Sequence, residues 1–440
     1  MSKQQDAPEP LAYDCDVLVI GGGPAGSTAA ALLAQRGYRV TVFERDRHPR
    51  FHIGESLLPA NLPLFERLGV QDQMRAIGME KFGAEFNSPL HAQSQKFNFG
   101  DAWDKSMPLA YQVRRSEFDE ILLRNAAAKG AAVIEECRVT GVEFLDNNRG
   151  VVVHAERDDG VSEMRRARFV VDASGRDTFI ANKLKLKKRN TRHNSAAVYG
   201  HFSGAQRLPD KDEGHISLFW FEHGWFWFIP LRDGATSVGV TTWPYYMKTR
   251  AGRSLEQFFL DTIAMCPALV ARLSNATLVS QVEATGNFSY ACDRTHGPGY
   301  LLLGDAYTFI DPVFSSGVLL AMNGAFNAVD AIEVCLKNPA QSKQALAAFD
   351  KKLRHGPREF SWFIYRVTNP TMRNLFMEPG NPLRAKEALL SLLAGDIFGK
   401  TPIWRSLFVL KALYYVISLV NLRRTVAAWQ QRKKNIMPVR

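Results

Sequence analysis

A glycine-rich segment that joins two apolar runs constrains the fold of this chain more than any other feature. Gly21, Gly23 and Gly26 have the spacing G-x-G-x-x-G and follow directly on the apolar run 16–20. The alanine- and leucine-rich segment after them predicts a helix, and the run 38–45 predicts a second strand. A strand, a helix and a strand in this order form a right-handed crossover unit, which requires a parallel sheet.

Each glycine of this motif has its own geometric role. Gly21 permits the tight turn, Gly23 lets the backbone approach a pyrophosphate, and Gly26 lets the helix pack closely on the strand. The start of the helix, at Ala25, offers amide donors and a favourable dipole to phosphates. Glu44 ends the second strand 18 residues after Gly26, where an acid binds the ribose of adenosine. Together these features predict a dinucleotide site; a glycine turn that only packs well is the structural alternative.

The rest of the chain alternates helix and strand patterns around this unit. Helices are predicted at 58–68 and 116–129, the second opening with Ser116, and strands at 132–145, 150–156 and 167–173. The segment 195–242 is rich in β-branched and aromatic residues, which favours an antiparallel sheet. From about Pro339 the pattern is helical. The expected fold class is therefore α/β, with a doubly wound parallel sheet interrupted by an antiparallel insertion.

Charge and cysteine content exclude several classes of protein. The net charge is +11, but nine positive and no negative residues follow Asp396, so the body of the chain carries only +2. A charge confined to the tail argues against a general nucleic-acid surface. Five scattered cysteines predict neither a disulfide framework nor a metal site, and they favour a reducing cytoplasm. No uncharged apolar run of eighteen residues is present, and the polar leader 1–12 does not resemble a signal peptide.

Two further segments distinguish FAD from NAD. The segment 301–317, LLLGDAYTFIDPVFSSG, resembles the second FAD-binding segment of the flavin hydroxylase superfamily, in which Gly304 and Asp305 hold the ribityl chain. The segment 170–178, VVDASGRDT, resembles the middle motif of that superfamily. The resemblance implies that Arg115, Val139 and Ser56 also contact the cofactor. A helix cap is the structural alternative for Asp305.

Three motifs narrow the resemblance to the flavin-dependent halogenases, over about residues 14–398. They are W-x-W-x-I-P at Trp225, Trp227, Ile229 and Pro230, the run RFHIGESLLP at 50–59, and F-x-x-P-x-x-S-x-G at 309–317. The chain is closer to the halogenases of pyrroles and phenols than to those of free tryptophan. The tryptophan enzymes have a glutamate before the serine of the last motif, where this chain has Phe314.

The resemblance also implies a domain division. A discontinuous FAD-binding domain of the glutathione-reductase type covers 13–88, 110–182 and 285–337. An antiparallel-sheet substrate domain covers 89–109 and 183–284, and a helical region with the basic tail covers 338–440.

The family chemistry assigns roles to several residues. Trp225, Trp227, Ile229 and Pro230 would wall the flavin from the substrate, and FADH2 with O2 would oxidise chloride or bromide to hypohalous acid. The halide would lie on backbone amides near Ser316 and Gly317, where a helix N-cap is the structural alternative. Lys81 would receive the hypohalous acid at the far end of a tunnel, although a lysine beside a glutamate is more often a solvated charge. Glu85 and His215 are alternatives for the base that removes the ring proton, and neither is supported by a motif.

Partners follow from the resemblance and from the tail. No second glycine motif follows a strand, so a separate reductase is expected to supply reduced flavin. Pyrrole-type halogenases of secondary-metabolite and antibiotic biosynthesis act on aromatic substrates tethered to carrier proteins, and the basic helix predicted at 404–429 suits an acidic carrier. Contact with a membrane surface, or simple packing on the flavin domain, are the alternatives for this helix.

Two other functions remain compatible with the sequence. One is a flavin monooxygenase or a geranylgeranyl-reductase-like enzyme on the same fold. The other is a flavin-binding partner without catalysis. Formation of a halogenated product would distinguish a halogenase from both of these functions.

Overall fold

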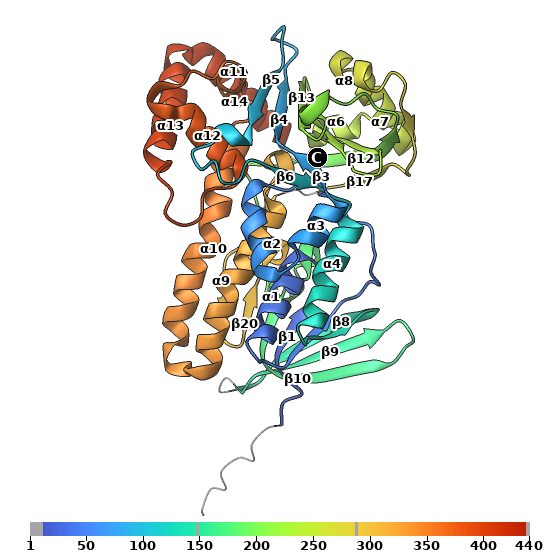
Figure 1. Ribbon diagram of the computed structural model, residues 1–440, viewed down its shortest axis with the longest axis vertical. Helices are drawn as coiled ribbons and strands as arrows, with labels where there is room; N and C mark the ends of the chain where they lie inside the picture. The colour runs from blue at the N-terminus through green and yellow to red at the C-terminus, as the bar shows by residue number, and fades with distance from the viewer. Residues whose placement is uncertain (1–11, 147–148, 287–288, 437–440) are drawn as a thin grey trace, which may run out of the picture.

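Two large β-sheets and a set of C-terminal helices make up the molecule in the computed structural model (Figure 1). The structure describes residues 12–146, 149–286 and 289–436. The polar leader therefore lies almost entirely outside the described residues.

The first sheet contains the predicted crossover unit. Its strand order is β19-β20-β10-β1-β2-β7, and β9 and β8 extend it beyond β10. β1 is parallel to β2, β10 is parallel to β1 and β20, and β7 is parallel to β2, as the motif requires. The strands are β1 (Cys15–Ile20), β2 (Val40–Phe43), β7 (Ala132–Ile134), β8 (Cys137–Phe144), β9 (Val151–Arg157), β10 (Ser162–Asp172), β19 (His296–Gly297) and β20 (Tyr300–Leu302). The predicted strand 132–145 is thus two strands, separated by Glu136 with φ of 55°.

Four long helices form a layer with this sheet: α1 (Pro24–Gln35), α4 (Arg115–Ala128), α9 (Gly317–Lys337) and α10 (Ser342–Ile364). α1 packs against α4 and α9, and α10 packs against α9. Among the described residues α9 is long and apolar enough to cross a membrane, but 61% of its most apolar window is buried inside the protein. It is a core helix. The predicted helix at 116–129 begins at Arg115 rather than at a Ser116 cap, and no side chain caps it.

The second sheet has the order β16-β12-β15-β14-β13-β4-β5, with β17 also paired to β12. Its strands are β4 (Gly83–Asn87), β5 (Gln95–Asn98), β12 (Ala196–Ser203), β13 (Ile216–Phe221), β14 (Gly224–Pro230), β15 (Thr236–Thr242), β16 (Thr277–Leu278) and β17 (Glu283–Thr285). The sheet is antiparallel apart from the β13–β4 pair, which is parallel. Here the structure differs from the predicted boundary at residue 88, because β4 hydrogen-bonds to β13 and so belongs to the second sheet.

Side chains that point alternately to the two faces of β13 and β14 divide the hydrophobic core in two. Trp225, Trp227 and Ile229 face the main core, whereas Phe226 and Phe228 belong to a second cluster. Helices α6 (Pro244–Lys248), α7 (Leu255–Ala264) and α8 (Pro267–Arg272) contribute side chains to this second cluster. Successive residues of a strand point to opposite faces, so the sequence already contained this division.

The chain after Lys337 is helical, as predicted. α11 (Pro370–Met377), α12 (Ala385–Ala394), α13 (Trp404–Val420) and α14 (Leu422–Ile436) lie beside the second sheet at one end of the molecule (Figure 1). Shorter elements connect the layers: α2 (Leu62–Leu68), α3 (Gln71–Ile77), α5 (Phe179–Lys183), the pair β3 (Met79–Lys81) and β6 (Ala110–Gln112), and the sheet of β11 (Lys187–Arg189), β18 (Tyr290–Cys292) and β21 (Thr308–Phe309).

Candidate flavin and halide site

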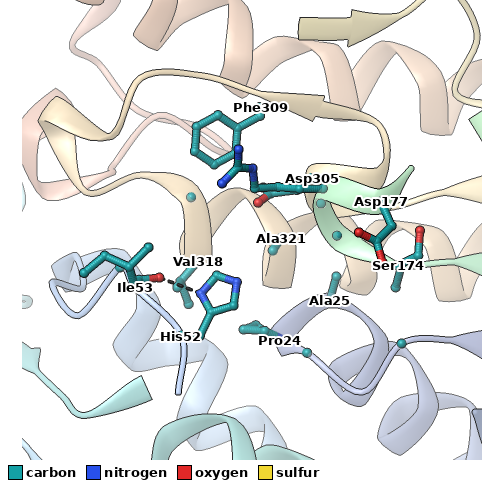
Figure 2. Close-up of a pocket in the computed structure, with 18 of the residues that line it drawn as sticks. Pro24, Ala25, His52, Ile53, Ser174, Asp177, Asp305, Phe309, Val318 and Ala321 are labelled. Carbon is teal, nitrogen blue, oxygen red and sulfur yellow. Dashed lines mark hydrogen bonds between the residues drawn. The ribbon is translucent and has the colours of Figure 1, made fainter. Parts of the chain in front are cut away.

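A cavity of about 1300 Å³ lies between the two sheets. Its wall includes the glycine loop after β1, residues 50–56, part of β8, the tryptophan face of β14 and residues 303–321. Figure 2 shows the part of this wall where Pro24 and Ala25 lie between Ser174 and His52 and below Asp305. The volume exceeds the usual range for small-molecule pockets and suits an extended ligand.

The glycine loop forms one end of the cavity and tolerates no larger residues at two positions. Gly21 has φ of +98°, and a Cβ on it would lie 2.5 Å from the carbonyl oxygen of Ala173. A Cβ on Gly26 would lie 1.9 Å from the carbonyl oxygen of Gly21. A Cβ on Gly23 would have no neighbour closer than 3.7 Å, so its backbone faces open space. This is the arrangement that a bound pyrophosphate requires.

Glu44 follows β2, lines the same end of the cavity and also binds the glycine loop. Its carboxylate accepts hydrogen bonds from the backbone N–H of Gly22, at 2.5 Å, and of Asp46, at 2.9 Å. The acid therefore holds the glycine loop in place as well as facing the cavity.

Asp305 and Arg115 also line the cavity, and Val139 lines it from β8. Burial raises the pKa of Asp305 to about 6, against a smaller lowering by the nearby charge of Arg115. Arg115 itself is held by two hydrogen bonds to Asp119, at 2.8 and 2.9 Å. Its direction is thus fixed before any ligand binds.

His52 is a cavity residue from the run 50–59, to which sequence reasoning assigned no role. Its Nδ1 donates to the carbonyl oxygen of Ile53 at 2.6 Å (Figure 2). Burial lowers its pKa to about 4, so the ring is neutral at physiological pH. The Nδ1 bond fixes the tautomer and leaves Nε2 as an acceptor.

The tryptophans form the wall on the side of the second sheet. Trp225, Trp227 and Ile229 all line the cavity, whereas Pro230 does not. The Trp227 indole N–H donates to Ser237 Oγ at 3.2 Å, and its ring covers Gly239, where a Cβ would lie 2.1 Å from the ring. Gly239 on β15 therefore provides the space that this indole occupies.

Lys81 lies behind the cavity wall and is 1% exposed. Its ammonium donates to Ser56 Oγ at 2.9 Å and to the carbonyl oxygen of Leu57 at 2.7 Å. No carboxylate pairs with it among the described residues. Burial alone lowers the pKa of Lys81 to about 7. Ser56 lines the cavity, so one side chain separates the cavity from a desolvated amine.

The two alternatives for the base differ in their surroundings. Glu85 forms a hydrogen-bonded ion pair with Arg272 at 2.8 Å. His215 is 1% exposed, and neither ring nitrogen has a hydrogen bond to a described residue, although Asp212 Oδ1 lies 3.4 Å from Nε2. Burial lowers the pKa of His215 to about 4 against an opposing contribution from Asp212, and the charges of Lys96 and Lys81 make smaller contributions in the same direction as burial.

The segment before α9 supplies the predicted halide position. Ser315 has φ of 55°, Ser316 occupies the N-cap position, and Gly317 begins the helix. Ser315 and Gly317 line the cavity, whereas Ser316 is 1% exposed behind it. The Ser316 hydroxyl does not cap the helix and has no hydrogen-bond partner in the part of the chain that the structure describes. A left-handed residue followed by helical N–H groups forms a concave site for an anion.

A buried polar network supports this segment, and sequence reasoning missed it. Asp311 accepts hydrogen bonds from His193 Nε2 at 2.8 Å and Ser195 Oγ at 2.9 Å, and from the backbone N–H of Val313 at 3.2 Å. Arg432 of α14 donates to His193 Nδ1 at 3.2 Å, which leaves the proton of the neutral ring on Nε2. The side-chain partners His193, Ser195 and Arg432 are more than a hundred residues from Asp311, so no local pattern could indicate them.

A second buried pair joins Glu55 of the cavity wall to His201 of β12. His201 Nε2 donates to Glu55 Oε1 at 2.9 Å, and the other oxygen of Glu55 is buried without a partner. Glu55 lies in the run 50–59 that carried part of the family resemblance, which was the only available signal for it.

Comparison with known proteins places the chain among flavoproteins. A family model of FAD binding domains matches residues 14–357. The flavin-dependent halogenase armH4 of Armillaria mellea is 36% identical over 365 residues, which cover 77% of this chain and 68% of that protein. A 1H-pyrrole-2-carbonyl-(peptidyl-carrier protein) chlorinase of Pseudomonas fluorescens is 32% identical over 409 residues, covering 88% and 90%.

A solved structure agrees with these relatives. The myxobacterial chondrochloren halogenase CndH superposes with a TM-score of 0.77 at 35% identity, covering 89% of this chain and 92% of that chain. The predicted α/β fold with a FAD-binding domain is confirmed.

Proposed function

Because the chain belongs to the flavin-dependent halogenases, we propose that it halogenates an electron-rich pyrrole or phenol, with Lys81 transferring the halogen. The enzyme uses FAD as FADH2, with O2 and chloride or bromide, as its relatives indicate. The observation that carries the assignment of Lys81 is its complete burial without a carboxylate, one side chain away from the cavity.

The residues of the cavity fit a flavin dinucleotide. Gly21 and Gly26 leave no room for a Cβ, and Gly23 keeps the loop open to the cavity, which suits the pyrophosphate. Glu44 faces the adenosine end, and Asp305, Arg115 and Val139 would contact the remainder. When bound, the reduced flavin and O2 supply the two-electron oxidation of the halide.

The tryptophan wall would separate this oxidation from the organic substrate. Trp225, Trp227 and Ile229 occupy the face of β14 toward the cavity, and Ser237 fixes the Trp227 indole. Substrate on the far side would meet only hypohalous acid. The backbone of Ser316 and Gly317 would bind the halide, and the unpaired Ser316 hydroxyl is a further donor close to it.

Lys81 would carry the halogen as a neutral amine. With a pKa of about 7, a substantial fraction of the amine is unprotonated at neutral pH. Its nitrogen attacks the halogen of hypohalous acid, the oxygen leaves with the amine proton as water, and an N-haloamine results. The aromatic ring then takes the halogen while a proton reaches the nitrogen, which restores the amine as the nitrogen–halogen bond breaks. The proton displaced from the ring passes to a base, which makes up for the proton taken up by the nitrogen. His215 suits this role better than Glu85, which is committed to Arg272.

Two partner proteins belong to the proposed function: a carrier protein that holds the substrate and a reductase that supplies reduced flavin. The chlorinase relative is named for a pyrrole on a peptidyl carrier protein, and similarity to it spans 90% of that protein, so we assign a carrier-tethered substrate here. The sequence holds one glycine motif, so reduced flavin comes from a separate reductase. Five free cysteines, four of them buried, suit a reducing cytoplasm.

The test is a reconstituted assay with FAD, NADH, an unrelated flavin reductase and either bromide or chloride. Pyrrole-2-carboxylate is supplied free and as the carrier thioester, beside a free phenol, and products are identified by mass. We expect halogenated product from the thioester. A hydroxylated product alone overturns the proposal and identifies a monooxygenase. Full halogenation by Lys81→Ala retains the class but overturns the role of the lysine.

A further inference from the structure

The last two helices each expose a row of apolar side chains. α13 and α14 meet near Asn421 at an angle of 103°. The exposed apolar side chains, called the tail surface here, are Phe408, Tyr415, Val416, Leu419 and Val420 on α13 and Leu422, Val426 and Trp429 on α14. Their spacing of three, four and seven residues places them along one side of each helix.

The C-terminal half of α14 is attached to the body of the protein. Arg432 donates to the carbonyl oxygen of Arg192 at 3.1 Å and to His193, and Asn194 donates to the carbonyl oxygen of Ile436 at 3.2 Å. The helix therefore cannot turn its apolar stripe inward without breaking these contacts. The stripe faces water as a consequence of how α14 docks.

Exposure is greatest at the bend between the helices. Val420 is 80% exposed, Leu419 69% and Leu422 55%. These aliphatic side chains protrude at a corner rather than line a groove. Large exposed apolar patches on soluble surfaces mark sites of interaction.

Positive charge surrounds this corner. Arg423 and Arg424 follow it directly, and Lys433 lies 3.9 Å from the centre of the Trp429 ring. Neither arginine takes part in an ion pair among the described residues, and no acidic residue follows Asp396. A protruding apolar corner flanked by basic side chains matches the interfacial helices that lie in the headgroup region of a bilayer.

We propose that the tail surface binds the surface of an anionic lipid bilayer, with the corner at 419–422 inserted among the acyl chains. The basic side chains then lie at the level of the headgroups. A second copy of this chain would bring like charges together, and an acidic carrier protein would pair with the arginines but leave the aliphatic corner in water. The proposal is independent of the halogenation chemistry, since none of these residues lines the cavity.

The experiment is flotation of the full-length protein with vesicles. One set contains phosphatidylglycerol and phosphatidylcholine at 3:7, and the other contains phosphatidylcholine alone. We expect binding to the anionic vesicles that weakens at 0.5 M NaCl. Changing Leu419, Val420 and Leu422 together to Ser should lower partitioning roughly 100-fold or more, and Arg423→Gln with Arg424→Gln should lower it about 30-fold.

The matched control changes two equally exposed apolar residues far from the tail. Val161→Ser with Met164→Ser, 51% and 62% exposed in the wild type, lies on the β9–β10 hairpin at the other end of the molecule (Figure 1) and should bind vesicles normally. FAD binding and melting temperature report that each variant is folded. The double variant Arg423→Gln with Arg424→Gln tests the proposal even if the triple serine variant does not fold.

Equal binding of the wild type to both vesicle sets, or no binding to either, overturns the proposal. A second set of results would also overturn it. In that case the wild type does not bind vesicles, and the triple serine variant at 419, 420 and 422 loses self-association or affinity for an acidic carrier protein.

Discussion

At the scale of single residues, burial changes what Lys81 can do. An isolated lysine has a pKa near 10.4 and is a poor nucleophile at neutral pH. Here the ammonium has two neutral oxygen partners, from Ser56 and Leu57, and no counter-charge. Desolvation without a carboxylate favours the neutral amine. The same lysine on the surface would be only a solvated charge.

The pKa of Lys81 predicts a pH dependence. With a value of about 7, the neutral fraction rises from about one tenth at pH 6 to about nine tenths at pH 8. The ratio of halogenated product to flavin oxidised should therefore increase nearly tenfold over this range and then level off. Measuring the ratio removes the effect of pH on flavin oxidation itself. Lys81→Met should lose halogenation at every pH and keep FAD binding.

A ratio that falls above pH 7 would contradict the neutral amine. It would show that the ammonium acts instead, as a hydrogen-bond donor to hypohalous acid.

At the scale of elements, β14 illustrates a pattern that the sequence determines. Its alternation of tryptophan and phenylalanine fixes which residues share a face, because the side-chain period of a strand is two. Which face borders the cavity depends on what packs against each side. The phenylalanine side is covered by side chains from α6, α7 and α8, so the tryptophan side remains for the cavity.

The segment between β21 and α9 depends on residues from two distant parts of the chain, 193–195 and α14. Asp311 holds its start through His193, Ser195 and the N–H of Val313. Asp311→Asn keeps the shape but removes the charge that strengthens these hydrogen bonds. We expect the KM for halide to rise about tenfold, with a smaller change in kcat and unchanged FAD affinity. Steady-state kinetics against bromide concentration measures this.

Asp261→Asn is the control for that measurement. Asp261 pairs with Arg253 in the α7 region, outside the cavity, and its change should leave the KM for halide within twofold. An equal effect of both substitutions, or loss of FAD binding in Asp311→Asn, would assign Asp311 a general structural role.

At the scale of the whole molecule, the cavity exists only because the two sheets face each other. Its wall takes residues from positions 20 to 357, and both sheets contribute. A ligand that contacts the glycine loop, residue 305 and β14 together therefore stabilises the arrangement of the sheets as well as each part.

FAD should raise the melting temperature accordingly. At 100 times its Kd, a ligand adds about 2.7 kcal/mol, which for 440 residues corresponds to an increase of about 3 °C. Scanning fluorimetry with FAD and with FMN at equal concentration measures it. FMN lacks the adenosine end, which the proposal places beside Gly21, Gly23 and Glu44, so its effect should be smaller. Equal shifts would mean that the glycine loop does not contact the cofactor.

The sequence alone determined the crossover unit, the fold class and the alternation of β14. These depend on local spacing, and local spacing acts through backbone geometry that is the same in every protein. The position of β4 in the second sheet was decided by its pairing with β13, which overrides local preference. The break at Glu136 and the start of α4 without a side-chain cap were likewise visible only in the structure. The burial of Lys81 and the network of Asp311 were likewise decided by segments that meet only in the folded chain. Desolvation and long-range hydrogen bonds have no signature in the order of residues, so these parts of the site needed the tertiary structure.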